Sequence, residues 1–396
     1  MTQEVKKLWQ VNTSLHPLVQ QYTAGDDVIY DQQLVPYDIA GTKAHAKMLK
    51  KAAVLTDKEY NILIQSLDKL LVKWEVGEFV ITPEQEDCHT AIEQYLTTDL
   101  GEIGKKVHTG RSRNDQAITM VRLYLGDKLV EVRHKLEQAT TAFAAKSHNL
   151  NHVMPGYTHM QKAMPTQVST WLISYSDALK DANHSLDAVA KLIDQNPLGS
   201  ASGFGIRNFE NDRQLTAKEL GFSKVQTNPQ YVGLSRGLFE YSFVQSLSYI
   251  MLVVNRFASD MMLFTTQEFG YFSLPDEYTT GSSIMPNKRN YDLFEIMRAN
   301  LSAVMAGQQA IAMTYSNLMS GYNRDLQTVK SSLISSTDTV TSTLDLLSEV
   351  VPKIAVNEAK LASSMTDDLY VTEKVYELVA NGMPFRDAYL EVKKSL

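Results

Sequence analysis

The sequence has 396 residues, of which 44% are hydrophobic, and it carries a formal net charge of −7. A chain of this length is long for one domain, and its apolar content is sufficient for a large core. An acidic chain without a basic block argues against nucleic acid as the main partner.

The chain contains a single cysteine, Cys88, which excludes a disulfide within the chain and a cysteine-based zinc site. This usage is typical of a reducing compartment, so we expect a cytoplasmic protein. Residues 1–10 show no apolar segment of the kind found in secretory signals. The longest apolar run, at 250–254, is much shorter than a membrane span, so we expect no membrane association.

The first hundred residues predict helices, and they show no clear strand alternation. Residues 34–50 form the first predicted helix, in which Gly41 is a weak point unless another element packs closely there. Apolar residues at helical spacing predict a second helix over 57–76. The sequence Thr82-Pro83-Glu84 is a helix-start pattern, so a third helix is expected over 83–100.

Hydrophobic periodicity is strongest over 114–147, where apolar residues follow one another at three- and four-residue steps. These residues are Ile118, Val121, Leu125, Leu129, Val132, Leu136, Ala139 and Phe143. A seam of this kind is typical of bundled helices, and it corresponds to roughly 45 Å of helix at 1.5 Å per residue. Further long helices are predicted over 165–195, 234–270, 291–319 and 325–350. The sequence therefore predicts an all-α fold built around a long helical bundle.

The segment 239–254 is apolar on almost every side of its predicted helix. Such a helix is buried all round, and in a monomer it would leave a large apolar patch exposed. We therefore expect bundles from several subunits to pack together. Residues 352–396 predict a shorter helical tail, interrupted at Asn381-Gly382-Met383-Pro384.

Residues 276–300 combine a small polar run with the start of a helix. Free backbone N–H groups and the positive end of the helix dipole make such a place suitable for an anion. Lys288 and Asn290 add donors suited to a carboxylate, and Ser282 and Ser283 add hydroxyl groups. The alternative is an ordinary surface loop with a helix cap.

Three other stretches concentrate polar residues where helices begin or end. In 105–116, Arg111 and Arg113 lie two apart in a Gly/Ser loop, and guanidinium groups bind carboxylates in a bidentate way. The alternative there is a solvated loop whose Asn114 or Asp115 caps the next helix. The stretch 154–161 contains His159, which would be an ordinary hydrogen-bonded residue if it has no catalytic role.

The third stretch, 320–330, places Tyr322, Gln327 and Lys330 at turn-like intervals, from which they could face one ligand. Two further stretches contain residue types found in metal or phosphate sites, but neither has the pattern of such a site. Residues 86–89 include potential metal ligands, but their crowding does not point them at one ion, so a structural or substrate-contacting His89 is expected rather than a metal site. Residues 200–205 are Gly-rich without the lysine of a phosphate loop, which indicates a turn.

The run Gly-Ser-Ser-Ile-Met-Pro-x-Lys-x-Asn at 281–290 resembles the signature loop of the fumarase/aspartase superfamily. The segments 108–116, 155–161 and 322–327 resemble the argininosuccinate lyase family more closely than its sister families. So do Glu86-Asp87-Cys88-His89, Asn196-Pro197-Leu198-Gly199-Ser200 and Pro384-Phe385-Arg386-Asp387-Ala388. The similarity runs from about residue 7 to the C-terminus.

The resemblance implies an all-α homotetramer in three domains, whose central helices form one shared bundle. The expected domains are an N-terminal helical domain (1–112), a central long-helix domain (113–352) and a short or truncated C-terminal domain (353–396). In that family three different subunits contribute to each active site.

The resemblance also implies the reaction, in which argininosuccinate is cleaved to arginine and fumarate without a cofactor or metal, as the last step of arginine biosynthesis. A proton leaves the carbon beside a carboxylate, the guanidinium nitrogen departs, and placed positive groups must stabilise the resulting dianion. The matching catalytic positions are Ser282, His159, the orienting carboxylate Glu295, and Lys288. The matching substrate-binding positions are Arg113, Asn114, Thr158, His89, Asn290, Tyr322, Gln327 and Lys330.

The sequence leaves open whether Ser282 or His159 takes the proton. Our hypothesis is that Ser282 is the base and that His159, oriented by Glu295, is the acid. The family usually has Gln, Lys and Pro where this chain has Asn287, Arg289 and Tyr291, and the missing Pro places the geometry of the closed loop in question. The family also has a substrate-contacting Ser about where this chain has Asp26-Asp27, and relatives usually continue beyond Pro384-Phe385-Arg386 for some tens of residues.

Two alternatives stay open. One is a sister fumarate-releasing lyase, such as adenylosuccinate lyase, aspartase or an enzyme acting on N-acylated argininosuccinate. The other is a non-catalytic structural tetramer of the crystallin kind. The presence of Ser282, His159, Lys288 and Asn290 argues against the second alternative.

Overall fold

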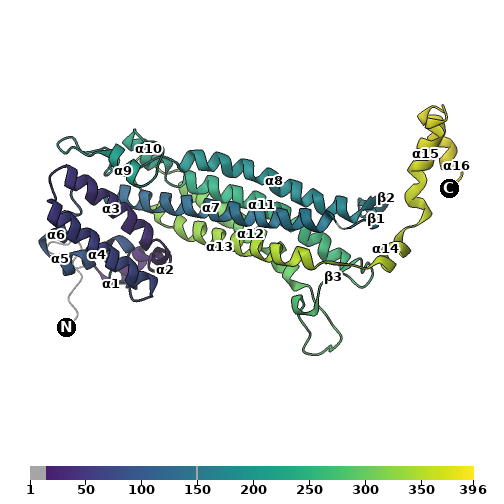
Figure 1. Cartoon of the computed structure of the whole chain (residues 1–396), viewed down its shortest axis with the longest axis horizontal. Coiled ribbons are helices and arrows are strands. Elements are labelled where there is room, and N and C mark those ends of the chain that lie inside the picture. Colours follow the sequence, from purple (N-terminus) through teal and green to yellow (C-terminus); the bar gives the residue numbers. More distant parts are fainter. Residues whose placement is uncertain (1–14, 149) are drawn as a thin grey trace. The chain divides into compact units, whose positions relative to one another are not determined.

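The structure of the chain is a computed structural model, and it describes residues 15–148 and 150–396. The expectation for residues 1–10 lies outside this part. Helices make up most of the described chain, which confirms the all-α prediction (Figure 1).

Short helices precede the long ones. They are α1 (Pro17–Ala24), α2 (Asp27–Tyr30), η1 (Asp31–Gln33), α3 (Val35–Lys51), α4 (Asp57–Glu75), α5 (Cys88–Leu100) and α6 (Glu102–Lys106). The predicted helices over 34–50 and 57–76 are confirmed. Helix α3 packs against α4 and α5. A Cβ added at Gly41 would lie 3.7 Å from Thr119 Cγ2, an ordinary van der Waals contact, so no close approach of a neighbour requires the glycine.

The predicted start of the third helix at Pro83 is wrong. Residues 82–86 form a turn, in which Glu86 has a positive φ of 73°. The helix begins at Cys88 instead, because the Asp87 side chain caps it by accepting the Thr90 N–H at 2.8 Å.

The predicted long helices are confirmed, with shifted ends. They are α7 (Arg113–His148), α8 (Val168–Ile193), α11 (Leu238–Phe264), α12 (Asp292–Tyr315) and α13 (Val329–Val350). Every residue of the predicted seam of α7, from Ile118 to Phe143, is buried. Helix α11 starts later than predicted because a separate helix, α10 (Pro229–Ser235), ends before Gly237, whose φ is +86°.

The sequence analysis missed an antiparallel hairpin of β1 (Val153–Thr158) and β2 (Gln161–Gln167). Its two-residue turn is His159-Met160, and both residues have positive φ values, 53° and 63°. This backbone is the one that a tight two-residue hairpin requires, although such turns usually contain Asn or Gly. The remaining elements are α9 (Arg213–Glu219), β3 (Phe272–Ser273), η2 (Asp276–Tyr278), η3 (Arg324–Gln327), η4 (Val351–Lys353), β4 (Ala355–Val356), α14 (Glu358–Ser364), η5 (Asp367–Tyr370), α15 (Val371–Ala380) and α16 (Phe385–Lys394).

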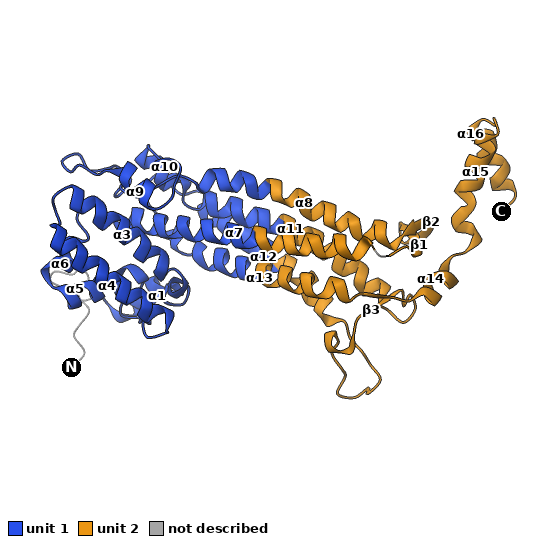
Figure 2. Cartoon of the chain, viewed as in Figure 1, with its two compact units in different colours: residues 1–132, 185–248, 303–339 blue, residues 133–184, 249–302, 340–396 orange. Residues whose placement is uncertain are grey.

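The chain divides into two compact units, shown in blue and orange in Figure 2. Unit 1 comprises residues 1–132, 185–248 and 303–339, and unit 2 comprises 133–184, 249–302 and 340–396. Each long helix contributes residues to both units. The division into three domains stays a prediction.

The core of unit 2 is an aromatic cluster. The Trp171 ring stacks on Phe272, with ring centroids 4.9 Å apart, and Phe143 meets Phe257 edge to face at 4.8 Å. The Trp171 indole N–H donates to Asp260 Oδ2 at 2.9 Å, which satisfies the polar atom of the ring. Aromatic pairs of this geometry add to the stabilisation from buried area.

The segment Pro229–Phe264 is long and apolar enough to cross a membrane by length and composition, and 61% of its most apolar window is buried inside the protein. The core helix of a folded domain has the same properties. Within one chain, helix α11 is not buried on every side, because its residues Tyr249 and Leu252 are 45% and 47% exposed.

Alanine substitutions at two helical glycines are expected to have opposite effects on stability. A Cβ at Gly104 would lie 2.3 Å from the Leu96 carbonyl oxygen, whereas nothing lies within 4 Å of a Cβ at Gly126 in α7. We expect Gly104→Ala to lower the free energy of unfolding by about 1–3 kcal/mol through overpacking. Gly126→Ala should raise it by about 1 kcal/mol through helix propensity. Urea unfolding followed by circular dichroism measures both, and equal effects would contradict the packing at Gly104.

Candidate active site

The predicted site residues fall into two groups. Unit 1 contains His89, Arg113, Asn114, Tyr322, Gln327 and Lys330. Unit 2 contains Thr158, His159, Ser282, Lys288, Asn290 and Glu295.

The loop around Ser282 is closed at its base by a backbone bridge. Thr280 and Asn290 exchange two hydrogen bonds, with N···O distances of 3.0 and 2.9 Å, and the Asn290 side chain donates to the Gly281 carbonyl. Within the loop, Ser282 Oγ accepts the backbone N–H groups of Ile284 at 3.3 Å and Met285 at 3.1 Å. Two N–H donors directed at one hydroxyl oxygen stabilise negative charge on that oxygen.

The rest of this loop is open to solvent. Lys288 is exposed and forms no ion pair in the described part of the chain. Arg289, one of the departures from the family pattern, pairs with Asp276 at 2.9 Å. Tyr291, which stands where a Pro was expected, precedes α12, and its carbonyl accepts the Phe294 N–H. Helix α12 therefore starts normally without the proline.

His159 lies at the tip of the hairpin of β1 and β2, next to Thr158, and both residues are exposed. Glu295, in the first turn of α12, is exposed too. No hydrogen bond or ion pair between described residues joins His159 to Glu295 or to Ser282. The single chain therefore presents these groups without connecting them.

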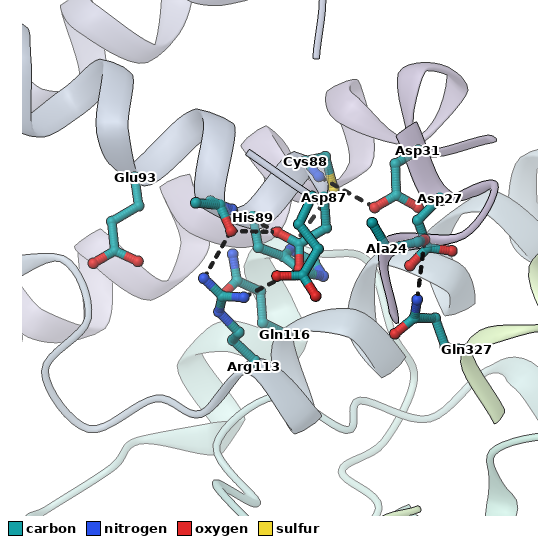
Figure 3. Close-up of polar contacts among 12 residues, drawn as sticks. Ala24, Asp27, Asp31, Asp87, Cys88, His89, Glu93, Arg113, Gln116 and Gln327 are labelled. Carbon is teal, nitrogen blue, oxygen red and sulfur yellow. Dashed lines mark hydrogen bonds and ion pairs between the residues drawn. The ribbon is translucent and has the colours of Figure 1, made fainter. Parts of the chain in front are cut away.

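The start of α7 in unit 1 carries a braced guanidinium group (Figure 3). Arg113 donates to Asp87 Oδ2 at 3.1 Å and to Thr90 Oγ1 at 2.8 Å. The Asp87 side chain also caps α5, so one carboxylate both begins that helix and positions Arg113. Burial raises the pKa of Asp87, but the charges of His89 and Arg113 lower it by more, so the carboxyl pKa lies below its usual value.

His89 is buried, and its Nδ1 lies 2.9 Å from Asp38 Oδ2 on α3. The Gln116 amide donates to both oxygens of Asp38, at 2.7 and 3.0 Å. Burial lowers the pKa of His89, but the charge and hydrogen bond of Asp38 outweigh it, so that pKa lies above its usual value. Asp38, Cys88 and His89 offer donor atoms within 4.8 Å of one another, a set that could hold a metal ion. The direct Asp38–His89 bond already satisfies two of the three donors, which fits a structural ion pair.

Lys330 is also buried in ion pairs. It contacts both Asp31 and Asp27, the latter at 2.9 Å, and Asp31 in turn accepts the Cys88 N–H at 3.1 Å. Burial lowers the pKa of Lys330, but these carboxylates raise it well above its usual value. The ammonium group that the resemblance assigns to substrate is thus held by the protein's own carboxylates.

Two cavities in unit 1 contain predicted site residues. Asn114 and Tyr322 line the first, of about 70 Å³, together with the loop 200–204. Gln327 lines the second, of about 490 Å³, and its amide donates to the Thr23 carbonyl at 3.0 Å. Residues 198–204 form turns, which confirms the turn predicted at 200–205, and this turn forms one wall of the first cavity.

Sequence reasoning missed the partners of the predicted residues. Asp31, Asp38 and Asp87 hold Lys330, His89 and Arg113 respectively. One signal was present for Asp38, because Asp38, Thr42 and His45 recur at helical spacing and all three are buried. Polar residues repeating on the buried face of a helix indicate partners on another element.

A scan of protein families matches a family model described as "Lyase" over residues 12–307. The chain is 43% identical to argininosuccinate lyase of Thermotoga neapolitana over 97% of its own length and 96% of that protein. It is 41% identical to argininosuccinate lyase of Xanthomonas campestris pv. campestris, covering 96% of this chain and 89% of that one. For Phocaeicola vulgatus the identity is 39%, with 98% and 87% covered.

Solved structures agree on the fold. An EDDS lyase in complex with formate superposes with a TM-score of 0.81 at 22% identity, covering 96% of this chain and 76% of that one. Class II fumarase from Schistosoma mansoni gives a TM-score of 0.77 at 18% identity, with 91% and 87% covered. A fumarate lyase:delta crystallin from Brucella melitensis bound to cobalt gives 0.76 at 20%, with 95% and 92% covered.

The Asp38–His89 pair predicts a pH-dependent contribution to stability. Protonated His89 stabilises the fold below its unfolded pKa near 6.5, and this contribution is lost as the pH rises through the raised folded pKa. Asp38 has a lowered pKa, so its contribution is present above its unfolded value near 3.8 and is lost as the pH falls through the folded value.

We expect Asp38→Asn to lower the free energy of unfolding by about 3 kcal/mol at pH 6, because it leaves a buried imidazolium without its carboxylate. NMR titration of the His89 ring should show a lower pKa in this variant. Asp68→Asn is the matched control, since Asp68 pairs with Lys43 on the surface and is 58% exposed. Its effect should be less than about 1 kcal/mol, and equal losses in both variants would contradict the prediction.

Proposed function

Because the chain belongs to the argininosuccinate lyase family of the fumarase/aspartase superfamily, we propose that it cleaves argininosuccinate into arginine and fumarate by β-elimination. Identity near 40% over almost the full length of several argininosuccinate lyases supports this activity over that of a sister lyase. We also propose a cytoplasmic location, which the single buried thiol of Cys88 supports.

The observation that carries the proposal is the contact of Ser282 Oγ with the N–H groups of Ile284 and Met285. A serine is a poor base unless its alkoxide is stabilised, and two backbone donors supply that stabilisation. In the proposed step the Ser282 alkoxide takes the proton from the carbon beside a substrate carboxylate. Lys288 and Asn290, on the same loop, stabilise the dianion that forms.

The carbon–nitrogen bond then breaks, and the leaving guanidine nitrogen takes a proton from His159. His159 is exposed, and an imidazolium side chain is a common general acid for this kind of transfer. In the proposal Glu295 orients the imidazole. The β1–β2 turn fixes His159 at its tip, so the ring projects from a defined backbone position.

In the described chain no bond joins His159 to Glu295 or to Ser282, and this supports an active site shared between subunits of a homotetramer. The exposed apolar side chains of Tyr249 and Leu252 on α11 support the same proposal, because a partner helix would cover them. Unit 1 would supply Arg113, Asn114 and Tyr322 to the substrate, and Thr158 would come from the hairpin. His89, Gln327 and Lys330 are bonded to groups of the protein itself, so contact with substrate would require them to exchange these partners.

The alternatives make different predictions for one assay. Fumarate absorbance is followed with argininosuccinate, N-acetyl argininosuccinate, adenylosuccinate or aspartate supplied in turn. Release of fumarate from argininosuccinate alone supports the proposal. Release only from another substrate assigns a sister activity, and no release from any of them favours a structural protein.

Ser282 and its neighbour Ser283 provide a matched pair of variants. We expect Ser282→Ala to lower kcat by about 10²–10⁴-fold, the usual contribution of a positioned base. Ser283→Ala should keep most of the activity, because its hydroxyl makes none of the loop's hydrogen bonds in the described chain. Undiminished turnover by Ser282→Ala would exclude it as the base.

Mixing of inactive variants tests the shared site. Ser282 lies in unit 2 and Arg113 in unit 1. If different subunits supply these two residues to one site, hybrid tetramers contain some sites with neither change. We expect each variant alone to be inactive and the mixture, after dissociation and reassembly, to regain measurable fumarate release. If the mixture stays as inactive as its components, each site is formed within one chain.

A further inference from the structure

Asp115 in the first turn of α7 is fully buried, and no cation bonds to its carboxylate in the described chain. Three backbone N–H groups hold it instead. Oδ1 accepts the Ser112 N–H at 3.0 Å, and Oδ2 accepts those of Gly199 and Ala201, both at 2.9 Å. Charge-assisted hydrogen bonds of this kind are roughly twice as strong as neutral ones.

The loop that supplies two of these donors has a strained backbone. Gly199 and Ala201 have positive φ values of 90° and 54°, and the second is unfavourable for a residue with a Cβ. Backbone N–H groups that converge in such a conformation form a nest for an anion. Here the anion is the protein's own carboxylate, and it fixes the conformation of the loop.

The same loop lines the cavity that contains Asn114 and Tyr322. Asn114 is adjacent to Asp115 in α7, and Ser202 and Phe204 follow the two donor residues. The side chains of Asn114 and Tyr322 make no hydrogen bond in the described chain, so they are available to a ligand. The Tyr322 ring is held in place by the Arg236 guanidinium, which lies 4.7 Å from its centroid.

We propose that Asp115 is a positioning residue for substrate, because its carboxylate fixes the loop 199–204 against the start of α7 and so forms the pocket in which Asn114 and Tyr322 bind one end of argininosuccinate. This inference rests on the proposed function. Asp115 itself does not line the cavity, and it acts through the loop and through its neighbour. Loosening of this wall should weaken the binding of substrate more than it slows the chemical step, which Ser282 and Lys288 carry out.

Burial raises the pKa of Asp115 to about 6, and the backbone hydrogen bonds oppose this increase. The direction of this pKa shift decides which substitution keeps the protein stable. A raised carboxyl pKa means that ionisation at neutral pH opposes folding. Asp115→Asn is neutral and removes that cost. Its amide NH2 group replaces one carboxylate oxygen, so it cannot accept a hydrogen bond from the N–H group that faces it. The variant should therefore disturb the loop without a large loss of stability.

The experiment compares wild type with Asp115→Asn in the full-length enzyme. We expect KM for argininosuccinate to rise about ten- to a hundredfold, the loss expected for one charge-assisted hydrogen bond, with kcat within about threefold. Hydrogen exchange followed by mass spectrometry should show faster exchange in peptides covering Gly199 and Ala201. An unchanged KM, whether or not kcat falls, would overturn the proposal.

Asp194→Asn is the matched control. Asp194 lies in the same unit, and its carboxylate also accepts a backbone N–H, from Ser223 at 2.7 Å. We expect this variant to keep the wild-type KM. Hydrogen exchange is independent of activity, so it tests the anchoring of the loop even if the wild type fails to cleave argininosuccinate. Unchanged exchange in Asp115→Asn would also overturn the inference.

Discussion

The need to neutralise buried carboxylates organises unit 1. Asp38 is fully buried and is balanced by His89 and Gln116, and Asp31 is balanced by Lys330. An isolated ionised carboxylate in such a place would cost several kcal/mol, so each acid requires its partner. These pairs connect η1, α3, α5, α7 and α13, elements far apart in sequence. Arg113, at the start of α7, pairs with Asp87 beside them (Figure 3).

Unit 2 follows the opposite principle. Its predicted catalytic groups lie on exposed turns, with Ser282 in a loop closed by the Thr280–Asn290 bridge and His159 on a two-residue hairpin turn. A lyase needs its charged groups accessible to substrate until the site closes. Tyr157 joins the hairpin to the aromatic cluster, because its ring contacts Phe264, which in turn contacts Trp171. The N–H groups at Ser282 supply local charge stabilisation. The proposed active site would combine the buried, braced groups of unit 1 with the exposed groups of unit 2.

Periodicity predicted the long helices well, because an apolar seam such as that from Ile118 to Phe143 specifies both the helix and its buried face. It failed at 153–167, where Met-Pro-Gly-Tyr-Thr has neither strand alternation nor an Asn-Gly turn, and where His159 and Met160 adopt positive φ values against their intrinsic preference. The start of α5 was misplaced for a related reason. Asp87 caps the helix, and that bond prevailed over the Thr-Pro-Glu pattern upstream.

The sequence by itself determined the helical class, the family resemblance and the identity of the candidate catalytic groups, because these depend on local spacing and on residue type. Only the tertiary structure decided which groups are free and which are engaged. Lys330 and His89 carry charges that face carboxylates from other elements, Ser282 Oγ meets two N–H groups, and Asp115 reaches a loop more than eighty residues away. Such pairings depend on contacts between distant segments, and neither periodicity nor a short motif encodes the partner of a buried charge.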